Sequence, residues 1–428
     1  RRVRDGEIQR AKVLIWRHYL PIALSIITFP FRLFLAVVLV AALRALKPLV
    51  HIRFARLHCY SMGGFSTPME SYFCQADAGM HPKRSFDIFH HYDYPHFNQA
   101  LVRPVKPKDA VCNQQLDIMY KRMIRIFEPA RGLESLVRML PRAGNDFIVS
   151  LDEVDPDRLF DSFPPHLTFT EEEDEQGTSR LREMGVETGS EFVCFYAHDG
   201  AWAYRARPRL VSIYGDWVSQ PERNSMIENY LPAIEALTDL GYYGIRVGKF
   251  VEKSITPPNP HVIDYSTQFH SDLMDVYLAA KCRFFLAQGG GVLGLPVMFR
   301  KPIAFVNVYP LDFLRWCCCY TSNIFIPKMY YSAKKGRTLS IREQVELGFV
   351  NFSAASPRFK DVTEDLGIEI LENSPEEIKE VAMEMEQTLR SEFETTAEDD
   401  ELQSRFLSLV ATHRDSLELT NGREQALK

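Results

Sequence analysis

The order of apolar and polar positions along the chain predicts strands and helices that follow one another in alternation. Short apolar runs typical of buried strands occupy residues 51–57, 84–91, 191–199, 243–248, 261–266, 282–288 and 301–307. Segments with apolar residues at helical spacing occupy residues 113–129, 224–242, 271–281 and 374–391. This alternation predicts an α/β protein with two doubly wound parallel sheets in tandem.

Residues near the ends of the expected helices support their placement. Ser374 is followed by a proline and, three residues on, by Glu377, which predicts a capping box at the start of the last helix. Ser66 or Thr67 precedes Pro68, so we expect another helix to begin there. The first half of the chain therefore repeats the strand–helix order of the second half.

One apolar segment near the start of the chain is suited to a membrane. Residues 18–31 and 33–43 contain no Asp, Glu, Lys or Arg, and only Arg32, close to Pro30, separates them. The length suffices for a spanning helix, but an arginine near the bilayer centre costs roughly 2.5–3.5 kcal/mol, and proline kinks a helix. Two short helices that lie in the membrane interface are favoured over one spanning helix, with a buried helical hairpin as the alternative.

Charge is distributed unevenly around a net value of −6. Residues 1–56 carry eleven basic and two acidic side chains, which leaves 39 basic and 54 acidic side chains for the rest of the chain. This asymmetry predicts a basic arm that meets an anionic surface, and it argues against nucleic acid as a partner of the body. The eight cysteines form no paired framework and no zinc-ligand spacing, which indicates reduced thiols and a cytoplasmic location.

Four segments follow from these patterns. We expect a basic, apolar, membrane-associating segment at residues 1–47 and a first Rossmann-like domain with its connection at residues 48–185. Residues 186–372 are expected to form a second Rossmann-like domain, and residues 373–428 a C-terminal helix with a charged tail. Residues 151–185 are acidic and contain prolines, which is typical of a connection with one short helix.

Candidate ligand contacts follow from the tendency of doubly wound sheets to bind ligands at the carboxyl ends of their strands. Arginines there can pair with a diphosphate, carboxylates can accept hydroxyl groups, and glycines let main-chain N–H groups approach an anion. The glycine run fits a tight turn equally well, and Asp272 fits a charge that stabilises a helix N-terminus. The candidates are Asp199, Arg205, Arg246, Asp264, Ser271, Asp272, Asp275, Gln288, Gly289, Gly290 and Gly291.

Several of these blocks resemble a known family. "IRFARLHCYSMGGFSTPMESYFCQADAG" (52–79), "FYAHDGAWAY" (195–204), "RNSMIENYLPAIEALTDLGYYGIRVGK" (223–249) and the stretch 264–307 are similar to blocks of a bacterial surface-polysaccharide glycosyltransferase family of the GT-B type. The resemblance covers about residues 48–350. The chain departs from the family at Ser61–Gly64, where the family has Arg-Ile-Gly-His, and at His198, where it has Arg.

The resemblance implies a GT-B-like fold, with two Rossmann-like domains facing a cleft, and the transfer of a sugar from a nucleotide-sugar donor. The acceptor would be a glycan or a lipid-linked glycan at the cytoplasmic face of the inner membrane, with the enzyme peripheral or single-pass. The glycines and Arg246 would hold the diphosphate, and Glu70 or Asp199 would act as the base if the reaction inverts. Neither a metal nor a cofactor is expected.

Two other functions fit the same fold. A nucleotide-sugar epimerase would turn over the donor without an acceptor and would have no need of a membrane arm. A non-catalytic, membrane-bound assembly protein would tolerate the departures at Ser61–Gly64 and His198. Loss of nucleotide binding separates the assembly protein from both enzymes, because only the enzymes depend on it.

Overall fold

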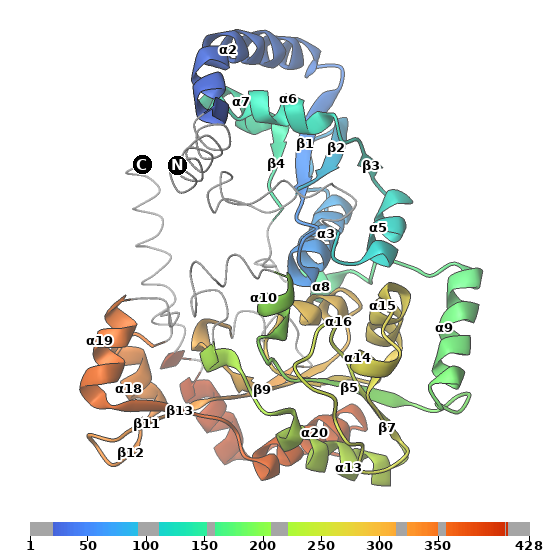
Figure 1. Ribbon diagram of the computed structural model, residues 1–428, viewed down its shortest axis with the longest axis vertical. Helices are drawn as coiled ribbons and strands as arrows, with labels where there is room; N and C mark the ends of the chain where they lie inside the picture. The colour runs from blue at the N-terminus through green and yellow to red at the C-terminus, as the bar shows by residue number, and fades with distance from the viewer. Residues whose placement is uncertain are drawn as a thin grey trace, which may run out of the picture. The chain divides into compact units, whose positions relative to one another are not determined.

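The computed structural model describes residues 20–92, 111–151, 159–206, 221–313, 323–349, 357–406 and 408–409 of the chain (Figure 1). The chain divides into two compact units, residues 1–168 and 169–428. Each unit contains a parallel sheet with helices, which confirms the predicted α/β class.

The first unit contains a four-stranded sheet in the order β3-β2-β1-β4. Its strands are β1 (His51–Leu57), β2 (Ser85–His91), β3 (Arg125–Ile126) and β4 (Ile148–Val149), and all described pairings are parallel. Strands β1 and β2 match the predicted runs closely, because their buried apolar residues carry a clear signal. The helices are α2 (Leu20–Leu46), α3 (Met62–Asp77), α5 (Gln114–Lys121), α6 (Ala130–Val137), α7 (Pro141–Gly144) and α8 (Leu159–Ser162).

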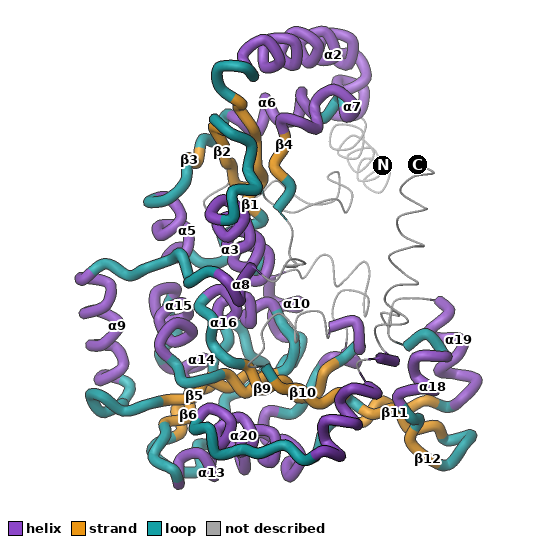
Figure 2. The backbone as a smooth tube through the Cα atoms, turned by 180° about the vertical axis from the view of Figure 1, so that it is seen from behind, coloured by secondary structure: helices purple, strands orange, loops and turns teal. Residues whose placement is uncertain are grey.

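Three expectations for this unit need correction. The apolar segment forms one helix, α2, with Pro30 inside it, instead of two short helices, and it is bent (Figures 1 and 2). Helix α3 begins at Met62 and includes Pro68, since the Ser66 hydroxyl donates to the Met62 carbonyl 2.7 Å away instead of capping the helix. Helix α5 ends at Lys121, because the chain then extends to pair β3 with β2.

The second unit contains a six-stranded parallel sheet in the order β10-β9-β8-β5-β6-β7. This is the doubly wound order 3-2-1-4-5-6 read from the other edge. The chain adds β5, β6 and β7 toward one edge of the sheet and then β8, β9 and β10 toward the other edge. The strand order therefore reverses at the junction of β5 and β8, the reversal point of this sheet. The strands are β5 (Phe192–Tyr196), β6 (Tyr243–Arg246), β7 (Val262–Ile263), β8 (Phe285–Ala287), β9 (Ile303–Val308) and β10 (Ile324–Pro327).

Helices cover both faces of this sheet (Figures 1 and 2). Helices α13 (Leu231–Asp239) and α20 (Pro375–Leu389) pack side by side on one face, where Ile234 and Met385 join the core with Phe195. Helices α14 (Tyr265–Gln268), α15 (Asp272–Lys281) and α16 (Gly294–Met298) lie on the other. The predicted caps are confirmed, with Ser271 at α15 and the Ser374–Glu377 box at α20.

Helix α9 (Glu171–Glu183) belongs to the second unit, whereas the sequence analysis placed it in the connection of the first. It packs on α15, where Gly177 lies against the Tyr277 ring and a Cβ on Gly177 would come within 2.3 Å of that ring. Asp174 also pairs with Lys281 of α15 at 2.6 Å.

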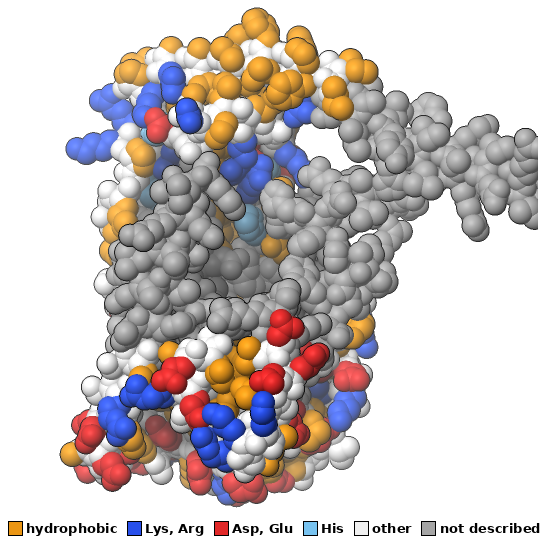
Figure 3. All heavy atoms as spheres, turned by 90° about the vertical axis from the view of Figure 1, so that its left-hand side faces the viewer, with side chains coloured by type: hydrophobic (Ala, Val, Ile, Leu, Met, Phe, Trp, Pro, Cys, Tyr) orange, Lys and Arg blue, Asp and Glu red, His pale blue; other side chains and the backbone are white. Residues whose placement is uncertain are grey.

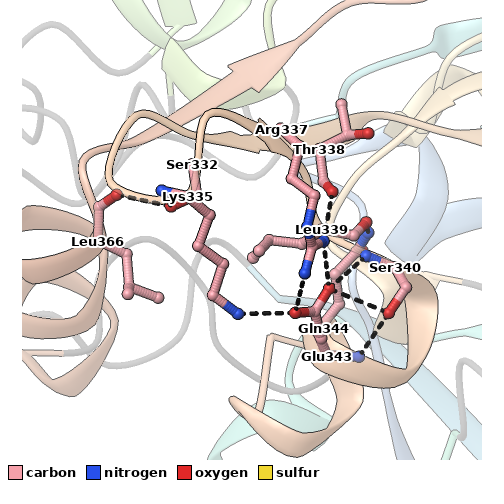
Figure 4. Close-up of polar contacts among 9 residues, drawn as sticks. All are labelled: Ser332, Lys335, Arg337, Thr338, Leu339, Ser340, Glu343, Gln344 and Leu366. Carbon is pink, nitrogen blue, oxygen red and sulfur yellow. Dashed lines mark hydrogen bonds and ion pairs between the residues drawn. The ribbon is translucent and has the colours of Figure 1, made fainter.

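A small antiparallel sheet that the sequence analysis did not predict adjoins this unit's last helices. It orders β12 (Arg337–Thr338), β11 (Met329–Ser332) and β13 (Ile368–Leu371). Helices α18 (Ile341–Glu346) and α19 (Pro357–Leu366) lie beside it. Glu343 of α18 accepts hydrogen bonds from Lys335, Arg337 and the Ser340 amide, which ties the β11–β12 hairpin to the helix (Figure 4).

Candidate functional site

The reversal point of the six-stranded sheet is the place where a doubly wound sheet ordinarily binds its ligand. Strand β5 leads into residues 197–200 and the neighbouring β8 leads into residues 288–291. The two loops are joined by main-chain contacts, since the Gln288 amide donates to the Tyr196 carbonyl at 3.2 Å. The His198 amide in turn donates to the Gln288 side-chain oxygen at 3.4 Å.

Gln288 joins the loops at this point through buried hydrogen bonds. Its side chain is 1% exposed, and its amide nitrogen donates to the carbonyl oxygen of Arg223. Its oxygen accepts from the Ser225 hydroxyl at 2.5 Å. The predicted ligand contact at Gln288 is therefore occupied by internal bonds, and the residue positions the segment at 223–225 against the glycine loop.

Two cationic side chains converge on this segment, and the second of them, Lys328, was not predicted from the sequence. The half-buried Arg223 donates to the Gly289 carbonyl at 3.0 Å. Lys328, which follows β10, is 2% exposed and donates to the carbonyl oxygens of Glu222 and Asn224 at 3.1 and 2.5 Å. Burial lowers the pKa of Lys328 to about 8. Within the part of the chain that the structure describes, no carboxylate forms an ion pair with Lys328.

His198 completes the polar group. Its Nδ1 lies 3.0 Å from the side-chain oxygen of Asn224. Burial, with a further contribution from the Arg223 charge, lowers the pKa of His198 to about 4. The imidazole is therefore neutral at neutral pH, so the positive charge at the reversal point comes from Arg223 and Lys328.

The glycine run has a packing reason. A Cβ on Gly289 would come within 2.7 Å of the Phe313 ring, and one on Gly290 within 2.9 Å of the Tyr196 ring. Gly290 has an extended backbone with φ of −174°, so its conformation does not require glycine. Close approach to aromatic rings, and not a left-handed turn, is the reason that Gly289 and Gly290 have no side chain.

Asp199 and Arg205 follow β5 at the same edge. The Asp199 carboxylate accepts the amides of Ala201 at 3.0 Å and Glu252 at 2.6 Å, which ties the start of α10 (Ala201–Ala206) to the loop after β6. Arg205 is exposed at the end of α10, with its guanidinium 6.0 Å from the centre of the Phe250 ring. Asp199 thus has a positioning role in the structure, and Arg205 is accessible to a ligand.

Arg246 and Asp264 form a buried pair between the ends of β6 and β7. Their closest side-chain nitrogen and oxygen atoms lie 3.6 Å apart, and Arg246 also donates to the Lys253 carbonyl at 2.7 Å. Asp264 accepts from the Ile255 amide and the Thr267 hydroxyl. These contacts hold the loop at 248–255, so the expected pairing of Arg246 with a diphosphate finds no support in them.

The N-terminus of α15 carries the remaining predicted contacts. Ser271 caps the helix by accepting the Met274 amide at 3.2 Å. Asp272 pairs with Lys249 at 3.0 Å. Asp275 accepts from Tyr265 and pairs with His270 at 3.1 Å, a residue that the sequence analysis did not include. The potential ligand atoms of His270, Asp272 and Asp275 lie within 4.8 Å of one another, a spacing that could hold a cation.

In the first unit, Glu70 lies on α3 and is 1% exposed. The imidazole of His166 is hydrogen-bonded to two carboxylates, with Nδ1 3.0 Å from Glu70 Oε1 and Nε2 3.1 Å from Asp77 Oδ2. Its hydrogen bond with Glu70 raises the pKa of His166. Glu70 and Cys74, with His166, form a second group that could hold a metal ion. The helical spacing of Glu70, Cys74 and Asp77 was the sequence signal that could have placed these three side chains on one face of α3.

The first sheet buries further charges at its strands. Arg53 of β1 pairs in bidentate fashion with Asp87 of β2, at 2.8 and 2.6 Å. His91, at the carboxyl end of β2, contacts Asp117 and Glu128, and hydrogen bonds to these two carboxylates raise the pKa of His91 against the opposing effect of burial. Sequence reasoning missed these pairs, because strand pairing brings their members together from distant positions.

Comparison with solved structures gives a structural similarity. No protein-family model and no curated protein matches the chain. A solved structure, that of the glycosyl transferase family 9 from Veillonella parvula, shares 11% identity with it at a TM-score of 0.44, over 80% of this chain and 98% of that one.

Proposed function

We propose that the protein is a glycosyltransferase whose second unit binds a nucleotide-sugar donor at the reversal point between β5 and β8. The observation that carries this proposal is the buried Lys328, which has no ion-pair partner in the described part of the chain and lies beside Arg223 and the glycine loop. Burial of the Lys328 ammonium is costly, and the charges of Glu372 and Glu222 offset only part of the effect of burial on its pKa. A diphosphate would supply a further anion and stabilise the charged form of Lys328.

Lys328 and Arg223 suit the chemistry of glycosyl transfer. The departing nucleoside diphosphate gains negative charge as the bond to the sugar breaks. Cations fixed beforehand by hydrogen bonds stabilise that charge without rearranging during the reaction. The main-chain carbonyls of Gly289 and Asn224 fix Arg223 and Lys328 in this way. The neutral His198 and the exposed Arg205 are available for hydrogen bonds to the donor.

The acceptor, a glycan or lipid-linked glycan, is proposed to bind the first unit. Of the two candidate bases, Asp199 is engaged by two main-chain N–H groups that tie the start of α10 to the loop after β6. Glu70 is the better candidate because it contacts His166, an imidazole that exchanges protons near neutral pH. The proposed location is the cytoplasmic face of the inner membrane.

A transfer assay with labelled nucleotide sugars tests the function. The purified protein is incubated with UDP-, GDP-, CMP- and dTDP-linked sugars, with and without a membrane extract as the source of acceptor. Glycosyltransfer predicts label in an extractable glycan or lipid only when acceptor is present, together with the released nucleotide, which is a nucleoside diphosphate from the UDP-, GDP- and dTDP-linked sugars and CMP from the CMP-linked sugars. An altered sugar still attached to its nucleotide, formed without acceptor, would indicate an epimerase. Absence of both products would favour the non-catalytic assembly protein.

A further inference from the structure

Helix α2 divides its charged and apolar residues between two faces, although its sequence is apolar almost throughout. Its inner face packs on the first unit, where Ala36, Val40 and Leu43 are buried, the last two against β1 and α6. These residues follow one another at helical spacing, so they form one stripe. The second half of the helix is thus attached to the body, so α2 is not a free segment.

The charged groups of this region turn toward the same inner face. Arg32 donates to the Ser135 hydroxyl of α6 at 3.4 Å, and Arg44 donates to the Ala143 carbonyl of α7 at 3.3 Å. Lys47, directly after the helix, pairs with Asp146 at 2.8 Å. The arginine that seemed to obstruct a membrane helix is therefore directed into the protein.

Apart from Thr28 and Arg44, the exposed side chains described in the helix are apolar. Ile27, Phe31 and Phe34 are 72, 64 and 63% exposed. Other large apolar residues of the helix are also exposed, namely Ile26, Phe29, Leu35, Val37 and Val38. Figure 3 shows these hydrophobic side chains gathered over α2, with Lys and Arg side chains next to them. An exposed apolar face of this extent marks an interaction surface.

We propose that α2 is an in-plane membrane anchor, which lies flat on a bilayer with its outer face in the acyl chains and does not span. A spanning α2 would draw α6 and the exposed Arg131, Arg138 and Arg142 toward the hydrocarbon, because they adjoin its inner face. In the flat position these arginines lie about one helix diameter away, at the level of the headgroups. The occupant of the face is therefore a lipid surface with anionic headgroups.

This inference does not depend on the proposed glycosyltransferase activity. It is tested by flotation of the purified full chain with phosphatidylcholine vesicles that contain or lack phosphatidylglycerol. The test variant combines Ile27→Ser, Phe31→Ser and Phe34→Ser. The matched control combines Met226→Ser, Leu240→Ser and Phe269→Ser, which are exposed apolar residues of the second unit. Circular dichroism and thermal unfolding verify that both variants fold.

We expect the protein and the control to float with the anionic vesicles. The test variant should bind more than about a hundredfold more weakly, since each large apolar side chain is worth about tenfold or more in partitioning. Equal flotation of all three proteins would overturn the assignment of the outer face. A dimer that forms through this face, with no vesicle binding, would overturn the lipid as occupant.

Depth-dependent quenching distinguishes a flat helix from a spanning one. Phe34 lies near the middle of α2, so a tryptophan from Phe34→Trp would reach the bilayer centre only if the helix spans. Quenching by lipids brominated near the headgroup supports the in-plane anchor. Stronger quenching by lipids brominated near the chain end would overturn it.

Discussion

The ammonium nitrogen of Lys328 lies 2.5 Å from the main-chain oxygen of Asn224, although 104 positions separate the two residues in sequence. Lys328 follows the edge strand β10, whereas Asn224 lies in the segment held by Gln288 next to the glycine loop. The contact brings a buried positive charge to the reversal point of the sheet. A cation at that position suits the proposed anionic ligand better than the arginine at the end of β6, whose side chain is engaged with Asp264 and the Lys253 carbonyl.

Removal of the Lys328 charge should weaken nucleotide binding. We expect Lys328→Met to reduce the affinity for the bound nucleotide sugar by about tenfold to a hundredfold, which corresponds to a lost charged hydrogen bond. Isothermal titration calorimetry measures the change. Lys301→Met is the matched control, because Lys301 precedes β9 at the opposite end of the strands. Equal affinities in the two variants would remove Lys328 from the site.

The affinity should also depend on pH in a defined direction. The pKa of Lys328 is lowered to about 8, so the free protein loses this charge as the pH rises above that value. Since an anion binds the charged form, the affinity should be constant well below pH 8 and fall as the pH rises through 8. Calorimetric titrations across this range should show the decline in the native protein and a flat profile in Lys328→Met. A decline of equal size in both would assign it to another group.

Loss of Arg246 should affect stability more than binding. Arg246→Ala leaves the Asp264 carboxylate buried without its cation, and removing one partner of a buried pair costs about 3–5 kcal/mol of unfolding free energy. Urea denaturation should show a clear decrease for this variant. Arg205→Ala, at an exposed arginine, should change the unfolding free energy by less than about 0.5 kcal/mol. An Arg246→Ala protein of unchanged stability that fails to bind nucleotide would instead place Arg246 in direct contact with the ligand.

The packing reason for the glycines leads to a rescue experiment. Gly290→Ala forces the new Cβ within 2.9 Å of the Tyr196 ring and should cost about 1–3 kcal/mol through overpacking. Adding Tyr196→Val to the Gly290→Ala variant should restore part of that loss, because the double variant lacks the ring. Gly132→Ala, where no atom lies within 4 Å of the new Cβ, should be neutral or stabilising. Thermal unfolding gives the stability of the native protein, Gly290→Ala, the double variant and Gly132→Ala. A double variant no more stable than Gly290→Ala would contradict the steric explanation.

The His166 bridge should stabilise the first unit on the acid side of neutral pH. The hydrogen bond with Glu70 raises the pKa of His166 above its usual 6.5, so the folded protein holds this proton more tightly than the unfolded chain. Its contribution is complete below the ordinary pKa and disappears as the pH rises through the raised value. The stability difference between native protein and His166→Gln should decrease accordingly in denaturation experiments. A difference that grows with pH would contradict the bridge.

Local sequence signals predicted the elements whose own residues determine them. The apolar pattern of β1 and the capping box at Ser374 needed no distant partner to be recognised. Helix α5 was predicted too long because its periodicity continues to Pro129, while pairing of Arg125 with Ile88 of β2 extends the chain earlier. Tertiary pairing overrides propensity in such segments.

The candidate site was predictable only in part. The position rule for doubly wound sheets led to His198, Asp199 and the glycine loop, since each follows a strand that the sequence reveals. Lys328 was missed because it follows the edge strand β10, whose partly exposed pattern gave no clear signal. The partners of Arg246, Asp264 and the Lys253 carbonyl, could not be predicted either, because they are brought together by the folded loop and not by local sequence.

The measurement that tests the central claim most directly is a calorimetric titration of the purified protein with UDP-, GDP-, CMP- and dTDP-linked sugars and the free nucleotides. It is repeated with Lys328→Met and with Lys301→Met. We predict saturable binding of one nucleotide class, strongly weakened in the first variant and unchanged in the second. Absence of binding by any nucleotide in a folded protein, or binding that is equal in both variants, would contradict the assignment of the donor site to the β5–β8 reversal point.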